Sequence, residues 1–322
     1  MRNILRFTIA VFWILFISSP DFLYSNEIFK KLTIDNGLAH TDANCIAQDS
    51  TGLIWIGTNA GLQSYDGYTL QTFDYYQGGH KIYQSHNRIN AVASSADKLW
   101  VGTESGLTCF DLNTHRYIPY YIEGKDQSFQ SDTFVSNLFF NPSSQHLWIR
   151  GDKGISVAKV CNDTLDLLEW ENEATWNQCR YADNLQVRGE NVWALIGSRV
   201  MCMGISNGKI SILDSYKMDN LLGERERIQT LFSTARYLYM RSARGCYRIP
   251  FEYDRLKKSE SSYVDFHSVN SDIPEYTRGK FIVHQDSILW CAYLGGVIEI
   301  QQPFSEHPIG RNHLENTKGG DL

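Results

Sequence analysis

The chain lacks the features that usually reveal a nucleic-acid, phosphate or zinc-peptidase site. Lys and Arg number 30 against 36 Asp and Glu, the formal net charge is −6, and no basic block occurs. Nucleic-acid binding depends on clustered basic residues, so we expect no nucleic-acid partner. A glycine-rich phosphate loop and a His-Glu-x-x-His pair are also missing. We therefore expect neither a bound metal nor a cofactor.

Cysteine is sparse and scattered along the chain. The seven residues form no Cys-x-x-Cys pair, and a zinc site needs clustered ligands. Isolated cysteines of this kind serve as small buried apolar residues in strands. A disulfide between Cys161 and Cys179 is the one pairing that the spacing leaves open.

Long hydrophobic runs are absent outside the N-terminus. Residues 7–17 form an apolar run behind Arg2 and Arg6, which is typical of an export signal and too short to span a bilayer. We expect residues 1–25 to be a signal peptide, with an uncleaved N-terminal anchor as the alternative. No other segment reaches the roughly 18 apolar residues that a membrane span needs. The sequence thus predicts an exported domain.

A repeated phrase is the strongest signal in the chain. Its clearest copies are residues 55–62 (Trp-Ile-Gly-Thr-Asn-Ala-Gly-Leu) and residues 100–107 (Trp-Val-Gly-Thr-Glu-Ser-Gly-Leu). A fixed period of this length indicates one supersecondary unit repeated along the chain. An aromatic residue opens each copy, 45 to 51 residues after the last: Trp55, Trp100, Trp148, Trp193, Tyr239 and Trp290.

Each repeat has room for four short strands. In the first repeat, residues 43–49, 53–58, 62–66 and 69–75 are separated by turns rich in Gly, Asn, Asp and Ser. Four strands per period are typical of a propeller blade, so we expect an all-β propeller over residues 28–302. The expected blades lie near residues 43–75, 89–121, 135–170, 184–214, 228–266 and 277–302.

The repeated residues have distinct structural tasks. A blade can bury its two apolar faces only against neighbouring blades, and the repeated aromatic residue is large enough to fill the wedge between them. The first glycine, two residues later, points to the same face and leaves room for a neighbouring ring. The second glycine falls in a tight turn, where positive φ costs glycine little. The first glycines are Gly57 and Gly102, and the second are Gly61, Gly106, Gly154, Gly245 and Gly296.

The two ends of the repeat region suggest how the ring is completed. Residues 28–33 read as an outermost strand for the final blade, which would close the ring and remove its sheet edges. Residues 303–322 resemble the lead-in to the first blade at residues 35–38 and are expected to begin a truncated seventh blade. We therefore expect six recognisable blades of a seven-bladed ring.

The first repeats resemble a known family. Leu-Thr-Ile-Asp-Asn-Gly-Leu at 32–38, Ile-Ala-Gln-Asp-Ser-Thr-Gly-Leu-Ile-Trp-Ile-Gly-Thr at 46–58 and Gly-Leu-Gln-Ser-Tyr-Asp-Gly at 61–67 resemble the two-component-regulator propeller repeat. The resemblance is strong over residues 28–111, moderate to about residue 157, and held mainly by spacing from 184 to 300. The family implies two seven-bladed propellers in tandem, in the periplasmic sensor region of hybrid histidine kinases from bacteria that degrade complex glycans.

The resemblance implies a periplasmic sensor with no enzymatic activity in this fragment. It would recognise an oligosaccharide, pack against a second propeller or a twin subunit as a homodimer, and signal to a histidine kinase module absent from this chain. Membrane attachment would come from a missing C-terminal helix or an uncleaved signal. Two other functions stay open: an exported propeller polysaccharide lyase or hydrolase, and a scaffold that docks proteins.

Two arginines break the repeat. Arg150 and Arg241 stand where the first two repeats have glycine, and a charge there must be paired or face the central channel. One interpretation is that they bind a carboxylate or sulfate of an acidic sugar, which Arg grips through two hydrogen bonds. The other is an inter-blade salt bridge with a neighbour such as Asp152.

Aromatic residues in the connections between blades are the second set of candidates. Tyr76, Tyr83 and Tyr120 fall in loops expected at a propeller face, where ligands commonly dock. They are either platforms for sugar rings or ordinary outer-strand aromatics.

The sequence gives no catalytic residue. Asp49 and Asp66 stand at turn edges, where Asp caps its own turn. A glycosidase needs two carboxylates facing each other across a cleft, which spacing alone does not show. The nine histidines are scattered without the spacing of a ligand pair.

Overall fold

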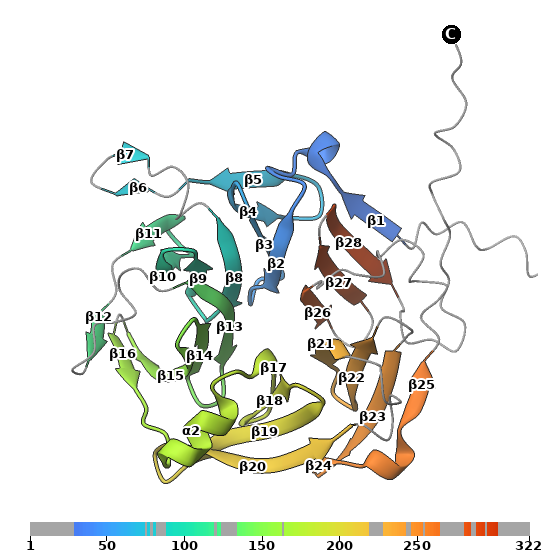
Figure 1. The fold of residues 1–322 in the computed structure, drawn as a ribbon. Helices are drawn as coiled ribbons and strands as arrows, with labels where there is room; N and C mark the ends of the chain where they lie inside the picture. Colours follow the sequence, from blue (N-terminus) through green and yellow to red (C-terminus); the bar gives the residue numbers. More distant parts are fainter. Residues whose placement is uncertain are drawn as a thin grey trace, which may run out of the picture.

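The computed structural model describes residues 29–301, except 75, 78–79, 82–87, 119–120, 124–133, 163, 219–227, 243–245, 254, 265–279, 285–287 and 294. In this part of the chain the strands form six sheets arranged as the blades of a ring (Figure 1). The expected all-β propeller is confirmed. The expected signal peptide (1–25) and the tail at 303–322 lie outside the described residues.

The first three blades run outward from the axis in chain order. Blade one contains β2 (Ala43–Gln48), β3 (Ile54–Thr58), β4 (Gly61–Tyr65) and β5 (Leu70–Phe73). Blade two contains β8 (Ile89–Ser94), β9 (Lys98–Thr103), β10 (Gly106–Asp111) and β11 (Arg116–Ile118). Blade three contains β13 (Val135–Asn141), β14 (His146–Gly151), β15 (Gly154–Cys161) and β16 (Thr164–Leu167), with β12 (Tyr121–Glu123) added in parallel to β16.

The last three blades follow the same plan. Blade four contains β17 (Asp183–Arg188), β18 (Asn191–Ile196), β19 (Arg199–Ser206) and β20 (Lys209–Lys217). Blade five contains β21 (Ile228–Ser233), β22 (Tyr237–Ser242) and β23 (Cys246–Glu252), with β24 (Arg255–Leu256) and β25 (Ser262–Val264) both paired to β23. Blade six contains β26 (Lys280–His284), β27 (Ile288–Tyr293) and β28 (Gly296–Gln301).

Short elements fill the connections between blades. The strands β6 (Tyr76–Gln77) and β7 (His80–Lys81) pair as a small hairpin after blade one. The helix α2 (Glu173–Cys179) precedes blade four, and the 3-10 turns η2 (Ile34–Asn36) and η3 (Lys258–Glu260) lie before β2 and after β24. Asn172 caps α2 by accepting a hydrogen bond from the Thr175 backbone N–H, as Asn commonly does at a helix start.

The N-terminal strand completes the sixth blade. β1 (Phe29–Leu32) pairs antiparallel with β28, so blade six takes its outermost strand from the other end of the chain (Figure 1). The turn at Gly296 fits tightly here, since a Cβ on this residue would lie 2.2 Å from the Leu32 carbonyl oxygen. This confirms the expected closing role of residues 28–33.

The ring of described residues closes with six blades, and the expectation of a seven-bladed ring is wrong. The innermost strand of blade six, β26, lies beside β2 of blade one as well as β21 of blade five. The backbone N–H of Gly295 donates to the Thr41 carbonyl oxygen at 2.9 Å and links the same two blades. With β1 at its outer edge and blade one against its face, blade six leaves no gap for another blade.

Each repeated aromatic residue is buried in its own wedge between two blades. Trp55 of blade one packs in a cluster with Ile89 and Leu99 of blade two. Trp290 of blade six packs with blade one, where its ring centroid lies 6.3 Å from that of Tyr65. The six aromatic side chains are 0–7% exposed: Trp55, Trp100, Trp148, Trp193, Tyr239 and Trp290. The predicted wedge-filling role is confirmed.

The first glycine of the repeat makes room for an aliphatic side chain rather than a ring. A Cβ on Gly57 would lie 2.5 Å from Ile89 Cγ2 and 2.3 Å from Cys45 Sγ. On Gly102 it would lie 2.5 Å from Val135 Cγ1. The first residue of the following innermost strand therefore enters this space, because the blades approach most closely near the axis. The second glycine adopts the expected positive φ, which is 125° at Gly61.

The seven cysteines are free thiols. Six are buried, as expected for small apolar strand residues, and Cys161 is exposed at the end of β15. The Cys161–Cys179 disulfide that the sequence left open is therefore not formed.

Replacing Trp290 tests the closing wedge. We expect Trp290→Ala to lower the free energy of unfolding by about 3–5 kcal/mol, because it leaves a cavity between blades six and one. Urea denaturation followed by circular dichroism measures the change. Tyr68→Ala, at a side chain that is 92% exposed, should change it by less than about 0.5 kcal/mol. Equal effects for the two variants would contradict the closed wedge.

Candidate functional site

A cavity of about 190 Å³ lies on the ring axis. Residues of all six innermost strands line it, namely β2, β8, β13, β17, β21 and β26. Most of its lining is apolar or carries a neutral amide or hydroxyl. Because every blade contributes to its wall, the closed ring fixes the shape of this channel.

One level of the channel is defined by the repeat itself. The residue of each innermost strand that pairs with the first-glycine position is Cys45 in blade one, Ala91 in blade two and Asn137 in blade three. The corresponding residues are Asp183 in blade four, Thr230 in blade five and Lys280 in blade six. Asp183 and Lys280 are the two charged residues among these six, and of the two Lys280 lines the cavity.

Lys280 lines the channel with a half-buried side chain. The ion pairs within 4 Å among the described residues do not include it. Burial lowers the pKa of Lys280 from its ordinary value, while the negative charge of Asp183 acts in the opposite direction. Burial also raises the pKa of the Cys45 thiol to about 12, so this thiol is neutral near pH 7. Asp183 is the carboxylate that acts on Lys280, from the exposed start of β17.

Arg150 holds the chain that enters blade four. Its Nε donates to the Ala182 carbonyl oxygen at 2.9 Å, and its Nη1 donates to the Gly151 carbonyl oxygen. No ion pair joins Arg150 to Asp152 in the described structure, so this version of the salt-bridge interpretation is wrong. The acidic-sugar role of Arg150 stays a prediction, with part of the guanidinium already used on backbone oxygens.

Arg241 lies deeper than Arg150. Its side chain is 4% exposed, and its guanidinium carbon lies 5.8 Å from the centre of the Phe281 ring. Burial lowers the pKa of Arg241 from its ordinary value, while Cys291 and Cys246 raise it. A ligand would touch little of this side chain, although its role in binding stays a prediction.

An aromatic and cationic cluster lies where the chain passes from blade three to blade four. The guanidinium carbon of Arg180 lies 4.9 Å from the Trp176 ring centre and 4.5 Å from that of Tyr181. Tyr181 is 63% exposed. A Cβ on Gly154, in the second turn of blade three, would lie 3.1 Å from Arg180 Cβ. Because Gly151 pairs with both Gly154 and Val135, the first residue of β13, the cluster sits at the face where the innermost strands begin, directly after α2 and before Asp183.

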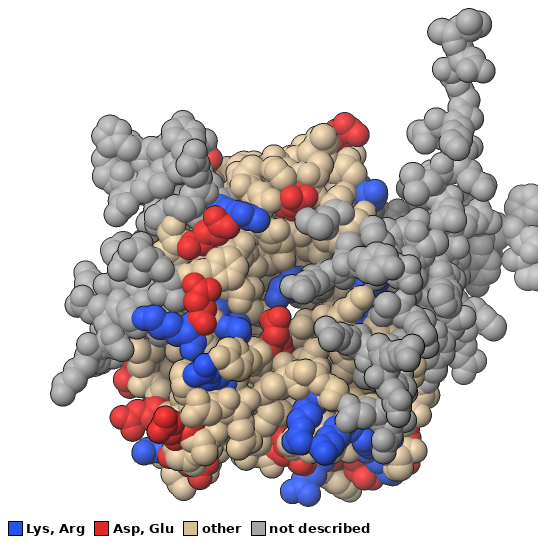
Figure 2. All heavy atoms as spheres, in the orientation of Figure 1, with Lys and Arg blue, Asp and Glu red and all other residues tan. Residues whose placement is uncertain are grey.

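Sequence reasoning missed both this cluster and Lys280. Trp176 lies in the inserted helix α2 and Arg180 and Tyr181 follow it, all outside the repeated phrase. Lys280 lies on a strand that the phrase does not include. The length of the connection between Leu167 and Asp183, with Trp176 and Tyr181 in it, was the available signal for the cluster. Figure 2 shows basic and acidic groups close to the centre of the ring, around the channel.

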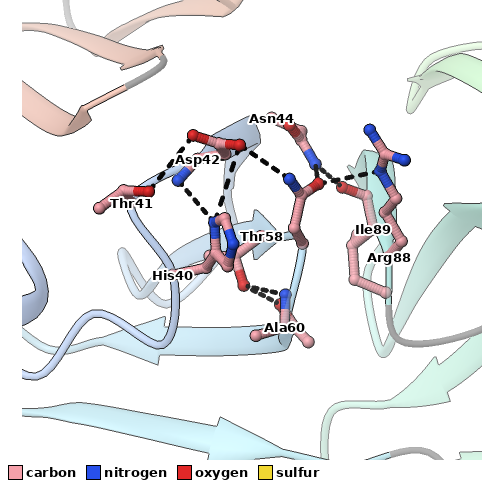
Figure 3. A network of polar contacts seen from close by, with 10 residues as sticks. His40, Thr41, Asp42, Asn44, Thr58, Ala60, Arg88 and Ile89 are labelled. Carbon is pink, nitrogen blue, oxygen red and sulfur yellow. Dashed lines mark hydrogen bonds and ion pairs between the residues drawn. The ribbon is translucent and has the colours of Figure 1, made fainter. Parts of the chain in front are cut away.

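A polar network joins the starts of blades one and two on the same face (Figure 3). The Asn59 Oδ1 atom accepts hydrogen bonds from Asn44 Nδ2 at 2.8 Å and Arg88 Nε at 3.0 Å. The Asn59 Nδ2 atom donates to Asp42 Oδ2 at 2.9 Å. Arg88 also forms an ion pair with Glu104 at 2.7 Å. This network holds together the chain segments at the starts of β2 and β8. Its two carboxylates, Asp42 and Glu104, are both paired within it.

The predicted tyrosine platforms cannot be placed around a site. Tyr83 and Tyr120 lie outside the described residues. Tyr76 is the first residue of β6, which lies at the edge of the ring after blade one (Figure 1). Their ligand-binding role stays a prediction.

Two candidate catalytic signals have structural explanations. The Asp49 carboxylate accepts from the Thr51 and Leu53 backbone N–H groups and from Trp55 Nε1, which confirms that it caps its own turn. Asp66 likewise accepts from Tyr68 and Thr69, and these hydrogen bonds lower its pKa from the ordinary value.

A Gly-x-Ser-x-Gly sequence, the pattern of a hydrolase nucleophile turn, occurs at residues 204–208. It forms the hairpin turn between β19 and β20, not the strand-to-helix turn of a hydrolase nucleophile. Across the described ranges, no group of three His, Cys, Asp or Glu residues could hold a metal ion. No helix in the same ranges is long and apolar enough to cross a membrane.

Comparison with known proteins identifies the repeat. The family model of the two-component regulator propeller matches residues 37–60. Histidine kinase P4 of Formosa agariphila is 38% identical over 73 residues, which cover 23% of this chain and 5% of the kinase. The chain therefore corresponds to a small part of that relative.

Solved structures share the fold. The extracellular domains of a hybrid two-component system and of a one-component system from B. thetaiotaomicron match with TM-scores of 0.54 and 0.51, at 15% and 16% identity. The matches cover 87% and 85% of this chain, but 42% and 40% of those domains. YCF48 bound to D1 peptide matches with a TM-score of 0.54 at 13% identity, over 88% of this chain and 84% of its own. At these identities the likeness shows the fold alone.

Replacing Asn59 tests the network of Figure 3. We expect Asn59→Ala to lower the free energy of unfolding by about 1–3 kcal/mol, because it removes the hydrogen-bond partner of two donors and one carboxylate. Glu104→Gln changes only an ion pair whose side chains are 49% and 35% exposed, and should cost about 0–1 kcal/mol. Urea denaturation of both variants gives the values. An Asn59→Ala cost no larger than that of Glu104→Gln would show that the network does not hold the two blades.

Proposed function

Because this propeller carries the two-component regulator repeat at residues 37–60, we propose that it is an exported sensor domain that recognises an oligosaccharide and signals to a histidine kinase module outside this chain. The repeat and the shared fold of extracellular two-component domains support a sensor role. The oligosaccharide and the kinase output go beyond this and rest on the following arguments.

The cluster of Trp176, Arg180 and Tyr181 is the observation that carries the proposal. Aromatic rings pack against the apolar faces of sugars, while neighbouring charged and amide groups hydrogen-bond the hydroxyls, and ligand sites combine these two features. The cluster joins two rings and a guanidinium in one connection on a rigid ring. Connections on rigid scaffolds are common positions for binding residues.

A sensor explains the face better than an enzyme does. A glycosidase needs two carboxylates across one cleft, whereas the charges that act on each other at the channel have opposite sign, the Asp183 carboxylate and the Lys280 ammonium. The lyase or hydrolase alternative predicts product release from a polysaccharide. The scaffold alternative predicts tight binding to a protein and to no glycan.

The kinase relative sets the expected context. This chain covers 5% of that relative, so the output module, a second propeller or twin subunit, and the membrane helix belong to the proposal. Location in the periplasm follows if residues 1–25 act as the export signal.

Binding to a panel of neutral and acidic oligosaccharides tests the proposal. A ligand that binds the folded state raises the free energy of unfolding, by about 2.7 kcal/mol at a ligand concentration of 100 Kd, and so raises the melting temperature. We expect one sugar class to do so, and a Trp176→Ala/Tyr181→Ala double variant to weaken its binding at least about 10-fold in calorimetry. The affinity should fall because the double variant lacks both aromatic rings against which a sugar would pack.

Tyr253→Ala is the matched control, because this tyrosine is 98% exposed and lies on a distant turn of blade five. It should leave the affinity unchanged. Absence of any shift across the panel with folded protein, or equal binding by the double variant, would contradict the proposed glycan site. Release of sugar products would favour the enzymatic alternative.

A further inference from the structure

We propose that the channel binds a carboxylate through Lys280, so that the glycan sensed at this face is an acidic one whose terminal unit enters the ring. This inference rests on the proposed function for its oligosaccharide, but the carboxylate site itself stands on the channel alone.

The arrangement of charges in the channel is the first argument. At the level of Lys280, the residues facing the axis on four other blades are neutral: Cys45, Ala91, Asn137 and Thr230. Lys280 therefore lines, from blade six, a cavity whose own lining holds no carboxylate, while Asp183 of blade four pairs with Leu195 at the same level. Asn137 and Thr230 add neutral polar groups to the same wall.

The cost of partly burying a cation that has no ion pair within 4 Å among the described residues is the second argument. An ammonium taken out of water without a partner is destabilised, and the direction of the Lys280 pKa shift agrees with this cost. Its nearest named charges do not satisfy it: Cys45 is a neutral thiol, and Asp183 forms no ion pair with it within 4 Å. A carboxylate in the cavity would give Lys280 a charged hydrogen bond.

The size of the cavity limits the occupant. Its volume of about 190 Å³ equals the share of roughly six water molecules in the liquid. A small acid or one terminal sugar unit fits this space. The aromatic cluster beside Asp183 lies at the same face, where it can hold the units that remain outside the channel.

Asp183 acts as the opposing charge at the entrance. It is exposed and near enough to Lys280 to affect its pKa, so it repels an arriving carboxylate and attracts the ammonium. Asp183→Asn should therefore strengthen binding of an acidic ligand and leave a neutral one unaffected. Removing the charge of Lys280 should therefore weaken the binding of an acidic ligand, whereas removing the charge of Asp183 should strengthen it.

Calorimetry of the full chain with two matched ligand pairs tests the inference. The pairs are free glucuronate against glucose, and a glucuronate-terminated disaccharide against its neutral counterpart. We expect each acid to bind at least about 10-fold more tightly than its neutral counterpart, because a hydrogen bond between charged groups contributes that much or more. Lys280→Gln should remove this preference, Lys280→Arg should keep it, and Asp183→Asn should increase it about two- to fivefold. Lys153→Gln, at an exposed lysine of blade three, is the matched control and should leave it unchanged.

The outcomes separate this inference from the proposed function. Binding of neutral and acidic sugars with equal affinity, or an unchanged preference in folded Lys280→Gln, would overturn the channel site and leave a glycan sensor standing. Binding of free glucuronate through Lys280, without binding of any oligosaccharide, would support the channel site and contradict the glycan sensor. If Lys280→Gln fails to fold, two measurements still test the channel site. These are the preference of the wild-type protein for acidic over neutral sugars and the increase of this preference in Asp183→Asn.

Discussion

The packing of one aromatic side chain into each wedge between blades is the interaction on which the ring depends. A four-stranded blade has two apolar faces and buries neither on its own. The indole of Trp55, Trp100, Trp148 or Trp193 fills the space that opens as two blades diverge from the axis, and Tyr239 and Trp290 do the same in the last two wedges. Because the sixth wedge is filled against blade one, the ring is closed by side-chain packing as well as by the β1–β28 pairing.

Closure has consequences for function. A closed ring fixes six innermost strands around one axis, and the cavity between them takes its charge from the single residue that each blade places at a given level. The described segments that lead into β2, β8 and β17 lie outside the repeated phrase, so the repeat imposes little on their sequence. This freedom explains why the inserted helix α2, the Arg180 cluster and the Asn59 network occur there. The residues that hold the ring together therefore lie in the repeated phrase, whereas the residues of the candidate site lie outside it.

The fold was predictable from sequence to the extent that the repeat determines it. The aromatic positions, the turn glycines and the closing strand at residues 28–33 follow from local periodicity, and the structure confirms them. The number of blades does not follow, because it depends on how Trp290 packs against Tyr65, which no spacing reveals. Lys280 and Arg180 were missed because each lies outside the repeated phrase. Arg150 was singled out correctly as a break in the phrase, but its carbonyl partners come from a connection whose path sequence does not give.

Amide hydrogen exchange of the two chain ends that meet in blade six tests the closed ring most directly. Protection from exchange reports how rarely a strand opens. The account predicts that peptides covering β1 and β28 exchange as slowly as the peptide covering β27, because β1 hydrogen-bonds to β28 and blade one covers the blade. Exchange of β1 within seconds, at the rate of an unstructured end, together with fast exchange along the outer edge of β28, would show that the ring is open and would contradict the account.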